Sequence, residues 1–359
     1  MWLPILACLA FLWPGGESAD GGSIRRVEPV PVIYTTDLFH PHGDMDDQVD
    51  LAVMYAIKGI ALKAVILDNG KVQKKRPGRV AVSQLNFLTG KSVPVAVGLA
   101  RKLRNPYDSG LSQPAEYQAG VRIILRILKT LKRKAVLVTV GSLRDVAAAF
   151  NRNPALFLKK VGRIFVFAGE ASNKGFSETN VKMDRHAFTR IMASGLPVYW
   201  VPCFDGGRWK NTGSASYWMT NYARLLNSVR PPILQYFIYA YTRSKENPLI
   251  FLGKPVDPVR KRALFKEKRN LWGAAAFLSV VDKGISLKPG YPVVALAQGE
   301  RNDDLLFDFV RVAIRLDQKG NVSYERRPAG TEVMQFRVKD PRNYGEAMTI
   351  VTARLLSSL

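Results

Sequence analysis

The chain has 359 residues, 47% of them hydrophobic and 23% charged, which excludes long disordered tracts and suits one large α/β domain or two ordinary ones. Two cysteines exclude a disulfide scaffold and a thiolate zinc cluster, and three histidines disfavour a polyhistidine metal site, so any metal would be bound by oxygen. A net charge of +24, from 53 basic and 29 acidic residues, favours anionic surroundings such as nucleic acid, acidic lipid or a polyanionic envelope. The charge alone does not indicate which of these applies.

The N-terminus has the pattern of an export signal. Residues 2–13 (WLPILACLAFLW) are continuously apolar and are followed by small residues, which is typical of a secretory signal peptide cleaved near Ser18 or Ala19. The apolar run is too short for a membrane span. We therefore expect a signal peptide over residues 1–19 and a protein exported to the periplasm or the extracellular space.

Strand-like and helix-like segments alternate along most of the chain. Six apolar strand patterns and five segments with helical spacing predict a doubly wound, mostly parallel sheet of the α/β class, covered by helices on both faces, over residues 27–284. The predicted strands are 30–36, 61–67, 93–97, 135–140, 164–168 and 197–202, and the predicted helices are 48–57, 79–88, 117–131, 143–150 and 185–194.

The pattern changes beyond residue 285. Residues 307–316, 322–326 and 333–338 alternate in the way of antiparallel strands, and a final helix is predicted over 344–356. We therefore expect residues 285–359 to form a small C-terminal α+β extension that packs on the main domain.

An unusual group of acidic residues follows the first predicted strand. Four aspartates, Asp37, Asp44, Asp46 and Asp47, lie within eleven residues. Ligands of doubly wound sheets bind beyond the carboxyl ends of the strands, where this segment would lie. Crowded carboxylates repel one another unless a cation neutralises them, and calcium prefers oxygen ligands of this kind. Helix capping explains one or two of the aspartates but not four, so the segment favours a calcium site.

This segment resembles the metal motif of the inosine-uridine preferring nucleoside hydrolase family, in which a strand ends in Asp-x-Asp-Pro-Gly-x-Asp-Asp. Asp37 matches the leading metal aspartate, and Asp46 and Asp47 match the closing pair. Similar blocks follow in the family's order at residues 95–103 (VAVGLARKL), 138–150 (VTVGSLRDVAAAF), 169–184 (GEASNKGFSETNVKMD) and 195–202 (GLPVYWVP). The resemblance covers residues 30 to 205.

The resemblance implies a calcium-dependent hydrolase of N-glycosidic bonds in nucleosides or related ribosides, acting through metal-activated water. It implies calcium ligands at Asp37, Asp47 and the backbone carbonyl of Val140. Asp37 would also accept the proton of the attacking water, and Asp46 would bind the ribose 2′-hydroxyl. Further sugar contacts are implied at Asn173, Glu178 and Asn180.

One family residue is missing. The family's later metal aspartate aligns with Leu271, and its neighbouring histidine aligns with Asn270. Asn270, Asp205 or Asp44 would then have to supply an oxygen ligand, and Asn270 in that role would lower the charge of the site and weaken calcium binding. The departure leaves an alternative open, a non-catalytic or substrate-shifted homologue that binds a sugar or a nucleoside.

Other features permit two interpretations each. His40 and His42, in the acidic loop, fit either substrate contact and protonation of a leaving base or a purely structural bond to a neighbouring aspartate. The aromatic stretch 217–241 fits either a pocket cover or helical core. Basic runs at 71–76 and 259–269 lack interleaved aromatic residues, so we expect no specific nucleic-acid partner. Non-specific polyanion contact through the basic surface and a homo-oligomer stay open.

Overall fold

The structure is a computed structural model that describes residues 28–41, 45–70, 73, 76–172, 176–296, 303–325 and 331–359. The predicted signal peptide, His42, Asp44 and Asn173 lie outside these residues. Among the helices that are described, none is long and apolar enough to cross a membrane.

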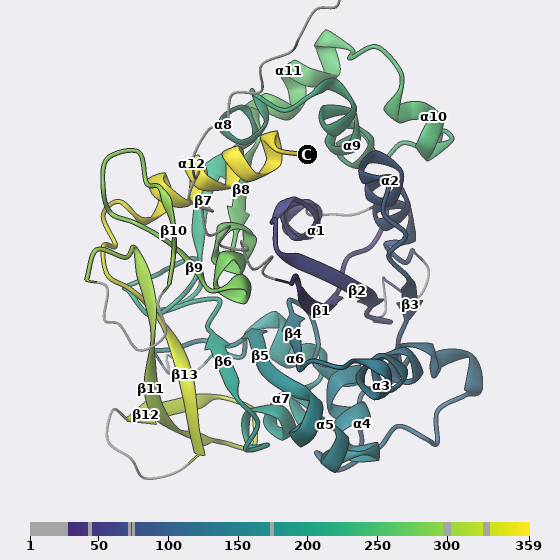
Figure 1. The fold of residues 1–359 in the computed structure, drawn as a ribbon, viewed down its shortest axis with the longest axis vertical. Helices are drawn as coiled ribbons and strands as arrows, with labels where there is room; N and C mark the ends of the chain where they lie inside the picture. Colours follow the sequence, from purple (N-terminus) through teal and green to yellow (C-terminus); the bar gives the residue numbers. More distant parts are fainter. Residues whose placement is uncertain are drawn as a thin grey trace, which may run out of the picture.

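A nine-stranded sheet organises the chain, in the order β12-β11-β13-β6-β5-β4-β1-β2-β3 (Figure 1). Six strands run parallel to their neighbours, and their order reverses beside β1, so the predicted doubly wound sheet is confirmed. These strands are β1 (Val30–Thr36), β2 (Ile60–Leu67), β3 (Val95–Val97), β4 (Ala135–Thr139), β5 (Val161–Phe167) and β6 (Val198–Val201).

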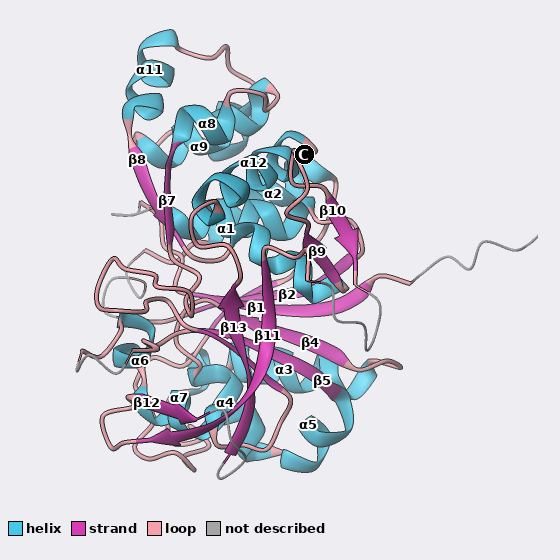
Figure 2. Ribbon diagram, turned by 90° about the vertical axis from the view of Figure 1, so that its left-hand side faces the viewer, coloured by secondary structure: helices cyan, strands magenta, loops and turns pink. Residues whose placement is uncertain are grey.

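The C-terminal strands continue this sheet. β13 (Thr331–Val338) pairs in parallel with β6, and β11 (Phe307–Leu316) and β12 (Val322–Glu325) add antiparallel strands beyond it. The final helix α12 (Tyr344–Ser357) returns to the main domain and packs on α1 (Asp46–Ala56). The predicted extension therefore shares the sheet and the core of the main domain (Figure 2).

Helices cover both faces of the sheet. One face carries α1, α12, α2 (Arg79–Thr89), α8 (Tyr222–Leu226), α9 (Pro231–Tyr241) and the 3₁₀ helix η2 (Ala274–Val281). The other carries α3 (Ala119–Thr130), α4 (Arg144–Arg152), α5 (Pro154–Lys160) and α7 (Arg185–Met192). The remaining elements are η1 (Ala115–Tyr117), α6 (Thr179–Met183), α10 (Pro248–Leu252) and α11 (Pro258–Lys266), with two small sheets, β7 (Trp218–Asn221) with β8 (Lys268–Leu271) and β9 (Lys283–Ile285) with β10 (Val293–Ala295).

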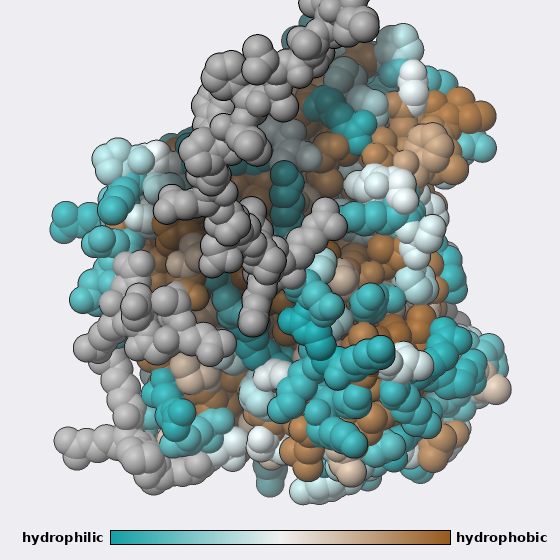
Figure 3. All heavy atoms as spheres, in the orientation of Figure 1, coloured by the Kyte–Doolittle hydropathy of each residue, from teal (hydrophilic) through white to brown (hydrophobic). Residues whose placement is uncertain are grey.

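The apolar sequence of the strands follows from this double cover. Successive side chains of a strand point to opposite faces, so on β1 Val32 and Tyr34 enter one core cluster and Ile33 enters the other. Figure 3 shows hydrophilic side chains gathered over α3 to α5, and hydrophobic ones over α10, where Leu249 and Ile250 are exposed. The strands are buried on both faces, and functional groups are left to the loops at their ends.

Candidate active site

A cavity of about 310 Å³ lies at the carboxyl ends of the central parallel strands. β1 neighbours β2 on one side and β4 on the other, and a ligand site is expected where the strand order reverses in this way. Two groups of side chains line the cavity. We call Asp37, Asp46, Asp47, Asp50 and Glu178 the acidic cluster, and Phe176, Phe204, Trp209 and Trp272 the aromatic cluster.

The acidic cluster begins where β1 ends. Asp37 directly follows the strand, and Asp46 and Asp47 form the first turn of α1, where the positive end of the helix dipole favours carboxylates. The Thr36 hydroxyl donates a 2.6 Å hydrogen bond to Asp47 Oδ1. The Asp37 and Asp47 carboxyl groups also contact each other. The structure thus brings together the three aspartates that the sequence singled out.

Crowding changes the acidity of this cluster. Burial, and after it the negative charges of Asp68 and Glu178, raise the pKa of Asp37 to about 7. Burial and the neighbouring Asp37 likewise raise the pKa of Asp47 well above its ordinary value. Carboxylates that are costly to ionise together are stabilised by a cation, because the cation favours their charged forms.

A main-chain carbonyl lies next to these carboxylates. The Val140 N–H donates to Thr35 O at 2.9 Å, so β1 holds the end of β4 in place. Asn180 Nδ2 donates to Val140 O at 3.2 Å and to Phe167 O at 2.9 Å. Gly141 permits this close approach, because a Cβ there would collide with Asp68 and with the backbone N of Asp37. Both amide hydrogens of Asn180 are therefore used, and its Oδ1 is left to accept.

Glu178 lines the cavity but is committed to the backbone. Its carboxylate accepts from the N–H groups of Gly169 at 3.0 Å, Asn180 at 2.8 Å and Val181 at 3.3 Å, and so caps α6. Burial raises its pKa in spite of these hydrogen bonds. The predicted sugar contact at Glu178 would have to share a carboxylate that already orients Asn180.

The structure does not bring His40 to the cavity lining. Its ring stacks on Tyr239, with centroids 5.0 Å apart, and its Nε2 lies 3.4 Å from Ser244 O. Burial lowers its pKa, which favours the neutral imidazole. Its neighbour Phe39 does line the cavity, beneath the guanidinium of Arg76.

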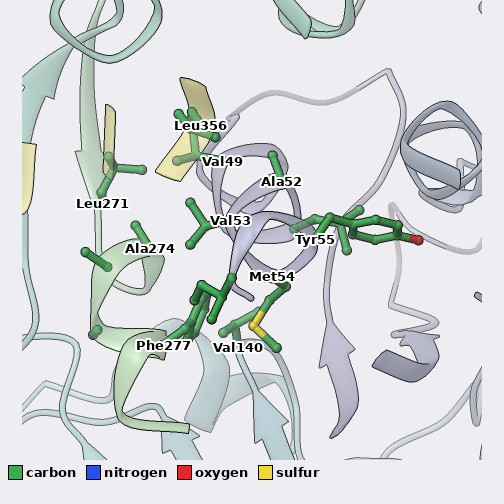
Figure 4. Packing of buried hydrophobic residues seen from close by; sticks show 14 of the residues in the cluster. Val49, Ala52, Val53, Met54, Tyr55, Val140, Leu271, Ala274, Phe277 and Leu356 are labelled. Atoms are coloured by element: carbon green, nitrogen blue, oxygen red, sulfur yellow. The ribbon is translucent and has the colours of Figure 1, made fainter. Parts of the chain in front are cut away.

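Asn270 and Leu271 also lie away from the cavity. Asn270 Oδ1 accepts a 3.0 Å hydrogen bond from the Tyr217 hydroxyl, on the strand pair β7–β8. Leu271 is fully buried in the core, beside α1, where Figure 4 shows it near Val49 and Ala274. The side chain at position 271 thus packs as an ordinary core residue, and a carboxylate at this position would face apolar groups.

Sequence analysis did not single out Asp50 or the aromatic cluster. Asp50 is 6% exposed and accepts from the Ala274 N–H at 2.6 Å, and burial raises its pKa to about 7. In the aromatic cluster, the Phe204 ring lies 5.4 Å from Trp209 and 5.7 Å from Trp272. Asp50 could have been noticed from its spacing, one helical turn after Asp46, whereas the aromatic residues are scattered along the chain.

The donors present fit calcium by their chemistry. Asp37, Asp47 and the Val140 carbonyl offer hard oxygen atoms, and calcium prefers such ligands. Across the described ranges, no three histidine, cysteine, aspartate or glutamate side chains close around one point to hold a metal ion. The site therefore offers oxygen ligands of the type that calcium prefers, but the acidic side chains do not surround a single point.

Known proteins resemble this chain over most of its length. The model of the family "Inosine-uridine preferring nucleoside hydrolase" matches residues 33–270. An uncharacterized protein of Schizosaccharomyces pombe is 25% identical over 178 residues, which is 44% of this chain and 57% of that protein.

Solved structures share the fold at low sequence identity. A plant nucleoside hydrolase superposes with a TM-score of 0.57 at 17% identity, over 92% of this chain and 99% of that one. An inosine-uridine preferring nucleoside hydrolase from Bacillus anthracis gives 0.52 at 16% identity, over 92% and 100%. Because the family model spans well over half of the sequence, this chain belongs to the inosine-uridine preferring nucleoside hydrolase family.

Proposed function

We propose that this protein hydrolyses N-glycosidic bonds in nucleosides or related ribosides and that it depends on calcium. The observation that carries the proposal is the meeting of Asp37, Asp46 and Asp47 with Val140 and Asn180 at one cavity. These groups come from three separate segments of the chain, and each one matches a position to which the family resemblance gave a role. Family membership supports the same reaction class.

Asp37 is the proposed general base. Calcium, when held by Asp37, Asp47 and the Val140 carbonyl, would supply positive charge and lower the pKa of a bound water. Asp37 accepts a proton from the attacking water, since it lines the cavity beside the proposed calcium ligands. The carboxylates beside the ring stabilise the positive charge that develops on the sugar as the N-glycosidic bond breaks.

Asp46 and Asn180 are the proposed sugar-binding residues. The Asp46 carboxylate accepts from the ribose 2′-hydroxyl, and Asn180 Oδ1 accepts from a second hydroxyl because its Nδ2 hydrogens are already used. Contacts of Asn173 and His42 with the substrate remain proposals that rest on the sequence alone. For Glu178 and His40 the hydrogen bonds and ring contacts favour a positioning role.

The aromatic cluster is the proposed site of the leaving base. Flat aromatic rings stack on nucleobases with little sequence preference. The Trp272 ring itself lines the cavity, beside Phe204 at 5.7 Å and Trp209 at 5.9 Å between ring centroids. Together the two clusters would hold a ribosyl group against the carboxylates and its base against the rings.

A release assay over a panel of purine and pyrimidine nucleosides tests the proposal. With calcium, the wild type should liberate reducing sugar, and Asp47→Ala should lose this activity together with calcium binding. Asn180→Ala should keep calcium binding and raise KM. Glu116→Ala, which removes an exposed carboxylate outside the cavity, is the matched control and should behave as wild type. Activity that survives Asp47→Ala unchanged would contradict the proposed mechanism.

The burial of Leu271 favours one alternative, a homologue that binds a sugar or nucleoside without turnover. A site with one carboxylate fewer than the family's would bind calcium more weakly. In that case every nucleoside of the panel should remain intact, while calorimetry still detects binding of a nucleoside that Asn180→Ala weakens.

We also propose that the protein is exported. The apolar segment at residues 2–13 and the small residues after it motivate this proposal. The N-terminus of protein recovered from the producing cells should begin near Ala19 or Asp20. Recovery of mature protein that starts at Met1 would refute it.

A further inference from the structure

Arg208 is the one basic residue among the described side chains that line the cavity, where the acidic cluster also lies. Its guanidinium carbon lies 5.9 Å from the centre of the Phe176 ring, so it contacts the aromatic cluster. Within the described parts of the chain, the guanidinium forms no hydrogen bond and no ion pair. The residue is exposed, so its charge is open to a group that enters from solvent.

Charge balance with the acidic cluster does not account for Arg208. A guanidinium close to a carboxylate lowers the pKa of that carboxylate. Burial, and after it the neighbouring acids, raise the pKa of both Asp37 and Asp47, and the main groups that act in the opposite direction are hydrogen-bond partners rather than Arg208. These two carboxylates therefore do not use the positive charge of Arg208.

Two buried carboxylates hold the loop that carries Arg208. Glu170 accepts from the backbone N–H groups of Gly206 at 3.2 Å and Gly207 at 3.3 Å. Asp205 Oδ2 accepts from a hydroxyl at 2.6 Å and from a backbone N–H at 2.9 Å farther along the loop. The turn requires its two glycines, because both have a positive φ, of 90° and 107°. The backbone at Arg208 is therefore fixed at the edge of the cavity.

The next residue joins this loop to the aromatic cluster. Trp209 has a φ of 62°, a conformation that is uncommon for residues other than glycine and that persists only where the surrounding structure holds it. Its ring centroid lies 5.4 Å from that of Phe204 and 5.9 Å from that of Trp272. Arg208 is therefore next to the rings that would hold the base, on the exposed side of the cavity.

An arginine without a protein partner at this place selects for negative charge. Its planar fork of N–H donors pairs with two oxygen atoms of a phosphate or a carboxylate at once. A neutral nucleoside offers no such group. The acidic cluster would repel an anion that lacked a positive partner, so an anionic substrate needs a residue such as Arg208 at the cavity.

We propose that Arg208 determines specificity by binding a phosphate or carboxylate group of the substrate, so that the site prefers anionic ribosides to neutral nucleosides. This inference rests on the proposed function, because it names the substrate class of the same site. The anionic group lies either on the sugar, as in a nucleotide, or on the base.

Three matched ligands test the proposal in the presence of calcium. Uridine is neutral, uridine 5′-monophosphate adds a phosphate to the sugar, and orotidine adds a carboxylate to the same base. Inosine and inosine 5′-monophosphate repeat the comparison with a purine. Calorimetry gives Kd, and release of reducing sugar gives kcat/KM. At least one anionic ligand should be favoured over its neutral parent by about tenfold or more, as expected for a charge-assisted bidentate contact. The favoured ligand shows which end of the substrate carries the charge.

Substitutions in the loop assign this preference to a residue. Arg208→Gln should reduce it to about threefold or less, and Arg208→Lys should retain part of it, because lysine keeps the charge without the planar fork. Lys210→Gln is the matched control, since it removes the same charge from the same loop but Lys210 is exposed and does not line the cavity. It should keep the preference of the wild type.

Equal values for neutral and anionic ligands in the wild type would overturn the inference and leave the proposed function intact. A preference that survives Arg208→Gln, or that falls equally in Lys210→Gln, would also overturn it. Such a preference would belong to the general field of a chain with a net charge of +24. Absence of binding and turnover for every ligand would overturn the proposed function and the inference together.

Discussion

The two sides of the cavity differ in how the chain builds them. Four of the five acidic residues come from one short stretch, the end of β1 and the first two turns of α1. The four aromatic residues come from three loops between residues 176 and 272, and Phe204 and Trp209 share the loop between β6 and β7. Asp50 and Glu178 of the acidic cluster are buried and accept backbone N–H groups, whereas Trp209 in the aromatic cluster is 48% exposed.

Under the proposed function, this difference would separate chemistry from recognition. Crowded carboxylates need exact positions, because each one shifts the pKa of the others. Stacking rings tolerate change, since their contact energy depends on area more than on a fixed atom. We therefore expect substitutions on the acidic side to affect calcium and turnover, and substitutions on the aromatic side to affect which base is accepted.

The strongest test of this contrast places a carboxylate in the core directly before Trp272. Leu271→Asp places an acid one residue before Trp272, in a fully buried apolar environment. The unfolding free energy should fall by roughly 3 kcal/mol or more, because the charge is buried without a partner. Urea denaturation measures it, with Met219→Asp on the adjacent strand as an exposed control. A stable Leu271→Asp protein that binds calcium more tightly would show that position 271 still reaches the site.

A second prediction concerns the pH dependence of stability caused by a buried carboxylate. Burial raises the pKa of Asp145 to about 7, and Asp145 lies outside the cavity. Between pH 5.5 and 7.5 the unfolded chain has already released this proton, whereas the folded chain retains it at the lower pH. Folding stability that Asp145 contributes should therefore be lost as pH rises through this range.

Denaturation curves of wild type and Asp145→Asn at the two pH values test the direction of this change in stability. Wild type should lose about 1–2 kcal/mol more than the variant between pH 5.5 and 7.5, since one pKa unit is worth about 1.4 kcal/mol. The difference should be the same with calcium or chelator, because Asp145 does not line the site. Equal losses in the two proteins would mean that Asp145 is ionised in the folded state.

The aromatic side is tested by Trp272→Ala. Loss of the ring should raise KM, or the Kd for a nucleoside, about tenfold, because stacking of one base is worth roughly 1–3 kcal/mol. Calcium affinity should not change. Tyr107→Ala, which removes an exposed ring that does not line the cavity, is the control. A loss of calcium affinity in Trp272→Ala would show that the aromatic ring also supports calcium binding. It would contradict the expected division of roles between the two clusters.

Sequence reasoning reached the acidic side because its residues are neighbours in the chain. β1 and β11 have the predicted bounds, and Asp37, Asp46 and Asp47 line one cavity as expected. It did not reach the aromatic cluster, whose residues meet only through tertiary packing. Within the predicted aromatic stretch, Tyr222 and Tyr236 proved to be buried core.

Position 271 shows a second limit of prediction from the sequence. Local similarity to the family aligns Leu271 with an aspartate, but whether a side chain faces the cavity or the core depends on the pairing of β8 with β7, which the sequence pattern did not predict. Asn270 was the expected substitute ligand for the same reason. On a strand, neighbouring side chains point in opposite directions, so Asn270 and Leu271 cannot both face one site.

The smallest expected effect is that of Asn270→Ala. The Asn270 amide oxygen is already held by the Tyr217 hydroxyl, and the residue does not line the cavity. The substitution should lower stability by about 1 kcal/mol through the lost hydrogen bond and change calcium affinity less than twofold. Tyr217→Phe removes the same hydrogen bond from the other partner and should have the same effect on stability. If calcium affinity fell tenfold in Asn270→Ala but not in Tyr217→Phe, the amide would have to turn toward the metal, and Asn270 would act as the substitute ligand after all.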